Sequence, residues 1–142
     1  MNKSKILLLS LTFLFLFGGC EEQGVKKEFY DSGELKSEVY YEDGEKEGLE
    51  IDWYSSGEKE REVPYKNGKK EGLTTEWYGS GKKRLEVLWE NGKIVGSRTG
   101  WYESGEKSFD IPFKNGKTEG LGISWYESGL KEYVIHYMSR AE

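Results

Sequence analysis

A strict repeat of 24 residues constrains this chain more than any other feature of its sequence. An aromatic residue followed by tyrosine recurs five times at that spacing, with no insertion or deletion between the copies. The five pairs begin at Phe29, Trp53, Trp77, Trp101 and Trp125. A fixed period of this size is typical of repeat architectures, in which each unit packs on its neighbours. Residues 29–142 are therefore predicted to form one repeat domain, with repeats that start at these five aromatic residues.

Further columns of residues agree with this period when the leading aromatic residue is taken as position 1. Position 5 is always glycine, position 11 is valine or isoleucine, position 13 is aromatic, and positions 16 and 20 are glycine. Besides the four tryptophans, the repeat-defining residues at positions 5 and 16 are Gly57, Gly81, Gly105, Gly68, Gly92 and Gly116. The agreement of several columns predicts that every repeat has the same backbone structure.

Each repeat contains two turn signals, and the turns predict strands between them. Positions 3 to 5 read x-Ser-Gly, and positions 14 to 16 read Lys/Glu-Asn/Asp-Gly. Serine, asparagine and aspartate favour turns, and glycine accepts a positive φ without steric cost. The intervening stretches have the usual length of β-strands. A single alanine beside 19 glycines disfavours helix. We therefore predict an all-β fold of about ten antiparallel strands in a meander.

The length of the turns decides which side chains share a face of the sheet. Three-residue loops at both turns would bring positions 1, 9, 11, 13, 21 and 23 together, and these positions are mostly apolar. The alternative at Asn-Gly is a two-residue type I′ loop, which pairs position 13 with position 18. One-sided alternation suits an antiparallel sheet, so we predict three-residue loops at both turns. Pro64 and Pro112 at position 12 predict a local bulge, because proline lacks a ladder donor.

The first twenty residues form a separate unit. Lys3 and Lys5 precede an apolar run over residues 6–17, which two glycines and Cys20 follow. A twelve-residue helix spans about 18 Å, too little for a hydrocarbon core of about 30 Å, so the run is typical of a signal peptide. Small residues before a lone cysteine resemble a bacterial lipobox, which implies cleavage before Cys20 and its acylation. We predict a lipoprotein signal peptide (1–19), a short linker (20–28) and a membrane-anchored protein of the bacterial envelope, facing the periplasm or the exterior. The alternative is an ordinary secretory signal.

Charge and residue types narrow the classes of function. Without residues 1–19, 19 basic and 26 acidic side chains remain, so the net charge is −7, which disfavours nucleic acid as a partner. One histidine and one cysteine are too few for a metal site built from these residues, and they leave few candidates for a catalytic base or nucleophile. Glu47, Glu71 and Glu119 recur at the same position, whereas a catalytic acid needs a singular environment. We predict no enzyme activity, no metal and no cofactor.

Two stretches resemble the MORN repeat, in its bacterial variant. One is the run over residues 65–72 followed by Glu76-Trp77-Tyr78, and the other is residues 113–120 followed by Trp125-Tyr126. The resemblance implies an elongated, single-layer antiparallel sheet of stacked hairpins. It also implies a role as a membrane-associated scaffold, as a protein-binding module or, in bacteria, as an antitoxin or immunity protein.

Together these observations predict a non-catalytic, lipid-anchored protein-interaction module, with a protein partner and the membrane as its contacts. An antitoxin or immunity role is one form of this prediction, and a homo-oligomer remains open. The candidate binding face consists of Val63, Tyr65, Val87, Trp89, Ile111 and Phe113. The alternative function is an envelope-glycan or peptidoglycan binding module that uses exposed tryptophan and tyrosine rings.

Overall fold

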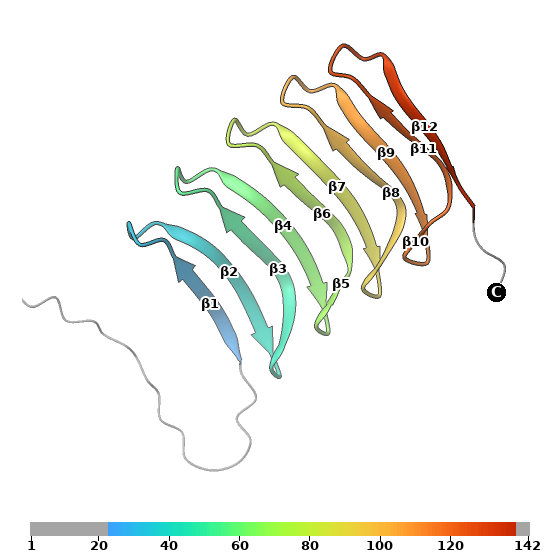
Figure 1. Cartoon of the computed structure of the whole chain (residues 1–142). Helices are drawn as coiled ribbons and strands as arrows, with labels where there is room; N and C mark the ends of the chain where they lie inside the picture. Colours follow the sequence, from blue (N-terminus) through green and yellow to red (C-terminus); the bar gives the residue numbers. More distant parts are fainter. Residues whose placement is uncertain (1–22, 139–142) are drawn as a thin grey trace, which may run out of the picture.

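The computed structural model describes residues 23–138 as one open antiparallel sheet whose strands follow one another in chain order (Figure 1). Ten strands form the main path, and β5 and β10 are two-residue strands beside β4 and β9. The strands are β1 (Gly24–Phe29), β2 (Leu35–Glu42), β3 (Glu45–Trp53), β4 (Lys59–Lys66), β5 (Lys69–Lys70), β6 (Gly72–Trp77), β7 (Lys83–Glu90), β8 (Lys93–Trp101), β9 (Lys107–Lys114), β10 (Lys117–Thr118), β11 (Gly120–Trp125) and β12 (Lys131–Tyr137). The predicted all-β, single-layer meander is confirmed.

The sheet begins earlier in the chain than the predicted repeat domain. The predicted signal peptide and Cys20 lie outside the described residues. The sheet begins at Gly24, so residues 24–28 of β1 fall in the stretch 20–28 that was predicted to be a linker. Residues 24–29 precede the first aromatic-tyrosine pair, and they form the first strand of a hairpin with β2.

The x-Ser-Gly turns are three-residue loops, as predicted. The Tyr54 N–H donates to the Glu58 carbonyl and the Gly57 N–H donates to the Tyr54 carbonyl, both at 2.9 Å. Gly57 has a φ of 96°, which a residue with a Cβ rarely adopts. The same pair of bonds closes the other four x-Ser-Gly turns.

The Asn-Gly turns are two-residue loops, so the prediction of three-residue loops is wrong here. Lys66 pairs directly with Lys69, and both intervening residues have positive φ, 48° for Asn67 and 70° for Gly68. These angles define a type I′ turn, whose twist matches that of the flanking strands. Asparagine tolerates positive φ better than other residues with a Cβ, and this lets the shorter loop form.

This shorter loop also overturns the predicted arrangement of faces. The two-residue loop pairs odd positions with even ones, as Trp89 pairs with Ile94. A one-residue bulge at position 8, beside the x-Ser-Gly turn, also shifts the register by one, so that Thr74 pairs with Val87. Positions 9, 11 and 13 therefore share one face with positions 20, 22 and 24, and we call this the valine face. Positions 1, 21 and 23 lie on the other side with positions 10 and 12, and we call this the tryptophan face.

The core of the sheet is a line of valines on the valine face. The exposed fractions are 8% for Val39, 1% for Val63 and 4% for Val87, and Thr74 is buried beside them. Each valine lies in a strand with neighbours on both sides, so adjacent strands remove it from water. The strands are visibly bent along their length (Figure 1).

A bulge at position 12 belongs to every repeat. Opposite Pro64 the strand is interrupted at Glu71, between β5 and β6. The Glu71 N–H donates to the Pro64 carbonyl at 3.0 Å, and the Glu119 N–H donates to the Pro112 carbonyl at 3.1 Å. The predicted bulge at the prolines is confirmed. The register also shifts at the equivalent places in β2–β3 and β7–β8, which carry no proline. Proline thus occupies an irregularity that the repeat already contains.

Side-chain hydrogen bonds join each hairpin to the next. The tyrosine at position 2 donates to the backbone carbonyl of the aromatic residue that opens the following repeat. The four bonds, of 2.6 to 2.8 Å, run from Tyr30 to Trp53, Tyr54 to Trp77, Tyr78 to Trp101, and Tyr102 to Trp125. The repetition of tyrosine at position 2 thereby has a structural cause.

Candidate functional site

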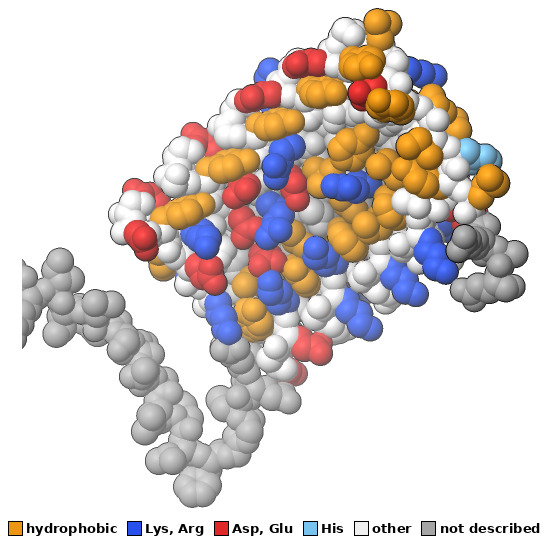
Figure 2. Space-filling model, in the orientation of Figure 1, with side chains coloured by type: hydrophobic (Ala, Val, Ile, Leu, Met, Phe, Trp, Pro, Cys, Tyr) orange, Lys and Arg blue, Asp and Glu red, His pale blue; other side chains and the backbone are white. Residues whose placement is uncertain are grey.

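The first half of the valine face carries a charged groove. It encloses about 410 Å³ and extends from β1 to β7. Its lining includes five carboxylates and three basic groups, which we call the ionic groove: Glu28, Lys36, Glu50, Asp52, Glu60, Arg61, Glu76 and Arg84. Figure 2 shows charged side chains gathered over the earlier strands and hydrophobic ones over the later strands of this face.

Alternation and a second irregularity place these residues together. Glu50, Asp52 and Glu76 occupy positions 22 and 24, which face the same side as position 9, where Arg61 lies. Arg84 is an extra residue in β7, because Glu76 pairs with Leu85 while Trp77 pairs with Lys83. Such a bulge re-aims a side chain, and here it brings position 8 into the groove.

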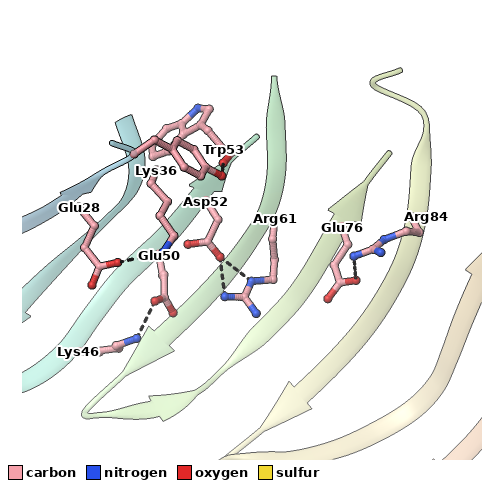
Figure 3. Close-up of polar contacts among 10 residues, drawn as sticks. Glu28, Lys36, Lys46, Glu50, Asp52, Trp53, Arg61, Glu76 and Arg84 are labelled. Carbon is pink, nitrogen blue, oxygen red and sulfur yellow. Dashed lines mark hydrogen bonds and ion pairs between the residues drawn. The ribbon is translucent and has the colours of Figure 1, made fainter. Parts of the chain in front are cut away.

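Ion pairs order the groove (Figure 3). Arg61 holds Asp52 through two contacts to the same oxygen, 2.7 Å from Nε and 2.5 Å from Nη2. Arg84 contacts Glu76 at 3.0 Å, and Lys46 contacts Glu50 at 2.7 Å. These partners lie on neighbouring strands or on one strand, so the sheet holds the charges in a fixed pattern.

The pKa values of Arg61 in the groove and of Lys46 beside it are raised. Burial lowers the pKa of Arg61, but the charge and hydrogen bond of Asp52 outweigh burial, so the pKa is raised overall. Burial likewise lowers the pKa of Lys46, and Glu50 outweighs it in the same way. Glu60 makes no ion pair with another described residue, so the lining has more carboxylates than cations to match them. The groove therefore presents mixed charge with an acidic excess.

The apolar part of the valine face adjoins the ionic groove. A second hollow of about 270 Å³ is lined by Val63, Val87, Trp89 and Phe113, with Arg61 and Glu76 shared with the groove. Of the predicted binding residues, Tyr65 and Ile111 lie on the same face, at positions 13 and 11. The structure thus brings all six predicted residues to one side of the sheet.

The tryptophan face is partly covered by lysine side chains. All four repeat tryptophans are half-buried. Trp77 pairs across its turn with Lys83, and the ammonium group of Lys83 lies over the next ring, 5.2 Å from the centre of Trp101. Lys59 lies over Trp77 in the same way at 5.5 Å. Such stacking combines cation–π attraction with coverage of the ring by the lysine stem.

The recurring glutamates have a structural role that sequence reasoning did not assign. The Glu47 carboxylate accepts a 2.7 Å hydrogen bond from the Asn67 N–H of the next turn, and Glu71 does the same for Asn91 at 2.6 Å. Val95 occupies this position in the third repeat and offers no acceptor. The signal was present in the sequence, because the spacing between Glu47 and Asn67 recurs between Glu71 and Asn91.

The ionic groove itself was missed. Three-residue loops at both turns would place even positions, and with them the acidic residues at positions 22 and 24, on the face opposite the valines. Over residues 23–138 the structure contains no cluster of three or more histidine, cysteine or acidic side chains suited to a metal ion. The same residues contain no helix long and apolar enough to cross a membrane.

Fold and surface define a class: an open, single-layer repeat sheet built from β-hairpin units. Two consecutive segments, residues 22–43 and 46–67, match the family model described as the MORN repeat variant. Each segment spans one x-Ser-Gly hairpin, β1–β2 and β3–β4, so the match covers the first two hairpins of the sheet. No enzyme family was found in this comparison. No curated protein matches the sequence.

Proposed function

We propose that this chain is a non-catalytic protein-interaction module, with the valine face as its recognition surface. One observation carries the proposal: on one side of an open sheet, the ionic groove of about 410 Å³ continues into an apolar hollow. Protein interfaces combine an apolar centre with polar and charged surroundings, and this face offers both. No described segment lies over this face.

The partner that fits this surface is a basic protein with an apolar protrusion. The acidic excess of the groove and the net charge of −7 for residues 20–142 attract a basic surface and steer its approach. A basic toxin is one partner of this chemistry, so an antitoxin or immunity role is the specific form that we propose. Fixed ion pairs such as Asp52–Arg61 would limit which basic surfaces match the pattern.

A glycan-binding role is the second candidate, and the geometry favours it less. Sugar binding would need open aromatic faces in a row. The repeat tryptophans are half-buried, and lysines lie over Trp77 and Trp101. These rings therefore act mainly as packing groups.

Acylation of Cys20 is the second part of the proposal. The apolar run before the lone cysteine supports it, and two or more acyl chains give stable membrane anchoring. Intact-mass measurement of the membrane-extracted protein should show diacylglyceryl on Cys20. A Cys20→Ser variant should remain uncleaved and unacylated; cleavage of this variant at the same site would contradict the proposal.

Charge reversal tests the recognition surface. The full chain would be used to capture proteins from the envelope fraction of its source, with peptidoglycan sedimentation in parallel. Glu60→Lys changes the groove without breaking an ion pair among the described residues, and Glu90→Lys makes the same change at an exposed turn outside it. We expect the first variant and Trp89→Ala to lose the captured protein and the Glu90→Lys variant to retain it. Co-sedimentation of the wild type with peptidoglycan, unchanged by Glu60→Lys, would instead support the glycan role.

A further inference from the structure

We propose that the two edge strands of the sheet, β12 and β1, are complementary docking edges through which a second copy of this chain adds head to tail. The inference concerns the ends of the sheet, and it does not depend on the partner proposed for the valine face.

The last strand lacks a neighbour that its sequence is suited to have. Ile135 occupies position 11 and is 51% exposed, whereas the valines at that position in β2, β4 and β7 are at most 8% exposed. Those strands are flanked on both sides, and β12 pairs only with β11 among the described residues. One more strand on the open side would cover part of Ile135, as neighbours on both sides leave the equivalent Ile111 half-buried.

The open side of β12 also lacks the usual protection of a sheet edge. Natural edge strands carry lysine, proline or inward charges that prevent pairing with another chain. The stretch Tyr133–Tyr137 contains no lysine, acid or proline. Position 10 is acidic in the four preceding repeats but is Val134 here, and Val134 is 52% exposed.

The opposite edge has the chemistry that the next repeat would present. Phe29 at position 1 of β1 corresponds to the repeat tryptophans, and both Phe29 and Val25 are exposed. Within the described residues, no tyrosine precedes Phe29 by one repeat to donate to its carbonyl. β1 therefore resembles the first strand of a hairpin that follows another hairpin.

Two junction contacts have one half at each end of the molecule. Tyr102 donates to the Trp125 carbonyl at 2.8 Å, but Tyr126 has no such acceptor among the described residues. In a head-to-tail pair, Tyr126 would reach the Phe29 carbonyl of the second copy. Lys131 would lie over the Phe29 ring of the second copy, as Lys83 lies over Trp101.

The registers inside the chain fix the register between copies. Arg61 pairs with Glu76 and Glu62 with Thr75 at the junction of β4 and β6, which sets position 9 against 24 and position 10 against 23. Tyr133 would therefore face Glu28 of the second copy, and Val134 would face Lys27 of the second copy. The Lys26 stem of the second copy would cover Ile135, as the equivalent Arg98 lies opposite Val87. Such a contact is heterologous, so copies add in an open series unless rotation closes a ring.

A pair of charge substitutions at Val134 tests this geometry. The full chain in detergent would be followed by sedimentation over a range of concentrations, and thermal unfolding would verify the fold of each variant. Val134→Lys places a lysine opposite Lys27 of the second copy and should weaken association by about fivefold or more. Val134→Glu restores the acid found in other repeats, pairs with that lysine, and should leave association unchanged or stronger. If both substitutions weaken association equally, β12 pairs with another β12 and the proposal is overturned.

Cross-linking gives an independent result if Val134→Lys does not fold. Directly opposed residues of antiparallel strands lie within the range of a disulfide. A Tyr133→Cys variant mixed with a Glu28→Cys variant should form a mixed disulfide, identified by the mass of the joined peptides so that Cys20 is distinguished. Species larger than dimers should accumulate with concentration. A monomer at every concentration, or disulfides only between two copies of Tyr133→Cys, would overturn the proposal.

Discussion

The hydroxyl of Tyr54 donates a 2.7 Å hydrogen bond to the backbone carbonyl of Trp77, the residue that opens the next repeat. This bond crosses the junction between two hairpins, so it links them in addition to strand pairing, packing and the contact of Lys59 with the Trp77 ring. Single hairpins are marginally stable alone, and repeat proteins depend on such junctions.

Removing one of these hydroxyls should loosen one junction. Tyr78→Phe deletes the 2.7 Å bond to the Trp101 carbonyl and should lower the free energy of unfolding by about 1 kcal/mol. Tyr126→Phe is the matched control in dilute, monomeric protein, because Tyr126 has no such bond among the described residues, and its unfolding free energy should be unchanged there. Urea denaturation measures both. Equal losses in the two variants would show that the hydroxyl acts through something other than the junction.

The glutamate of the Glu-Gly pair should stabilise the turn of the next hairpin. Glu71→Val removes the 2.6 Å bond to the Asn91 N–H and should cost about 1 kcal/mol of unfolding free energy. Val95→Glu supplies the missing acceptor for Asn115 and should add a few tenths of a kcal/mol or more. Both are measured by urea denaturation. A stabilising Glu71→Val would contradict the assigned role.

Two glycines with ordinary φ differ sharply in the space around them. A Cβ on Gly100 would lie 2.4 Å from Cε1 of Phe109, whereas a Cβ on Gly79 would meet nothing within 4 Å. Gly100→Ala should therefore destabilise the protein by about 1–3 kcal/mol through overpacking, and Gly79→Ala should be nearly neutral. Thermal unfolding compares them. A neutral Gly100→Ala would mean that the Phe109 ring has room to move away.

Stability should fall at alkaline pH through half-buried tyrosines such as Tyr54. Burial raises the pKa of Tyr54, and Glu60, Glu76 and Glu103 add to the rise against the opposing charge of Arg84. An unfolded tyrosine ionises near about pH 10. The stabilisation is thus fully present below that pH and is lost as pH rises through the higher folded pKa. Denaturation over a pH series should show a smaller alkaline loss for Tyr54→Phe than for the wild type.

Whole repeats should be removable, whereas half repeats should not. Deletion of residues 77–100 joins position 24 of one repeat to position 1 of another and preserves every alternation, so the shortened chain should fold. Deletion of twelve residues removes one strand and reverses the chain direction, so it should not fold. Circular dichroism and sedimentation distinguish these outcomes. Equal folding of both deletions would place the repeat boundary elsewhere.

Sequence alone predicted the parts of this structure that depend on local turn chemistry and period. The x-Ser-Gly loops, the ten-strand meander and the common face of Val63 and Trp89 all follow from the pattern. The face assignment failed because it used a loop one residue too long at Asn67-Gly68 and no bulge at position 8. The shorter loop changes which positions of the following strand lie beside the valines, and the bulge keeps the valines of successive repeats on one face. Apolar residues occur on both faces of this thin sheet, so hydrophobic alternation did not correct the error.

The ionic groove was beyond prediction for two reasons. It needs the parity that the type I′ turn sets, which brings Asp52 beside Arg61. It also needs the bulge that re-aims Arg84, and nothing in the composition of β7 marks that extra residue. The recurring tyrosines and glutamates were visible in the sequence, but their acceptors and donors lie 20 or 23 residues away and appear only when hairpins are stacked.

Each junction tyrosine bonds to the repeat that follows it, so the number of repeats in the sheet does not depend on the charged side chains at its surface. Each inner hairpin donates one tyrosine hydrogen bond to the hairpin that follows and accepts one from the hairpin before it, so a duplicated inner unit fits without new junction residues. Each added hairpin extends the sheet by about 10 Å, the width of two strands. Gain or loss of whole repeats therefore changes the length of the sheet in fixed steps, while the charged side chains of each repeat can differ.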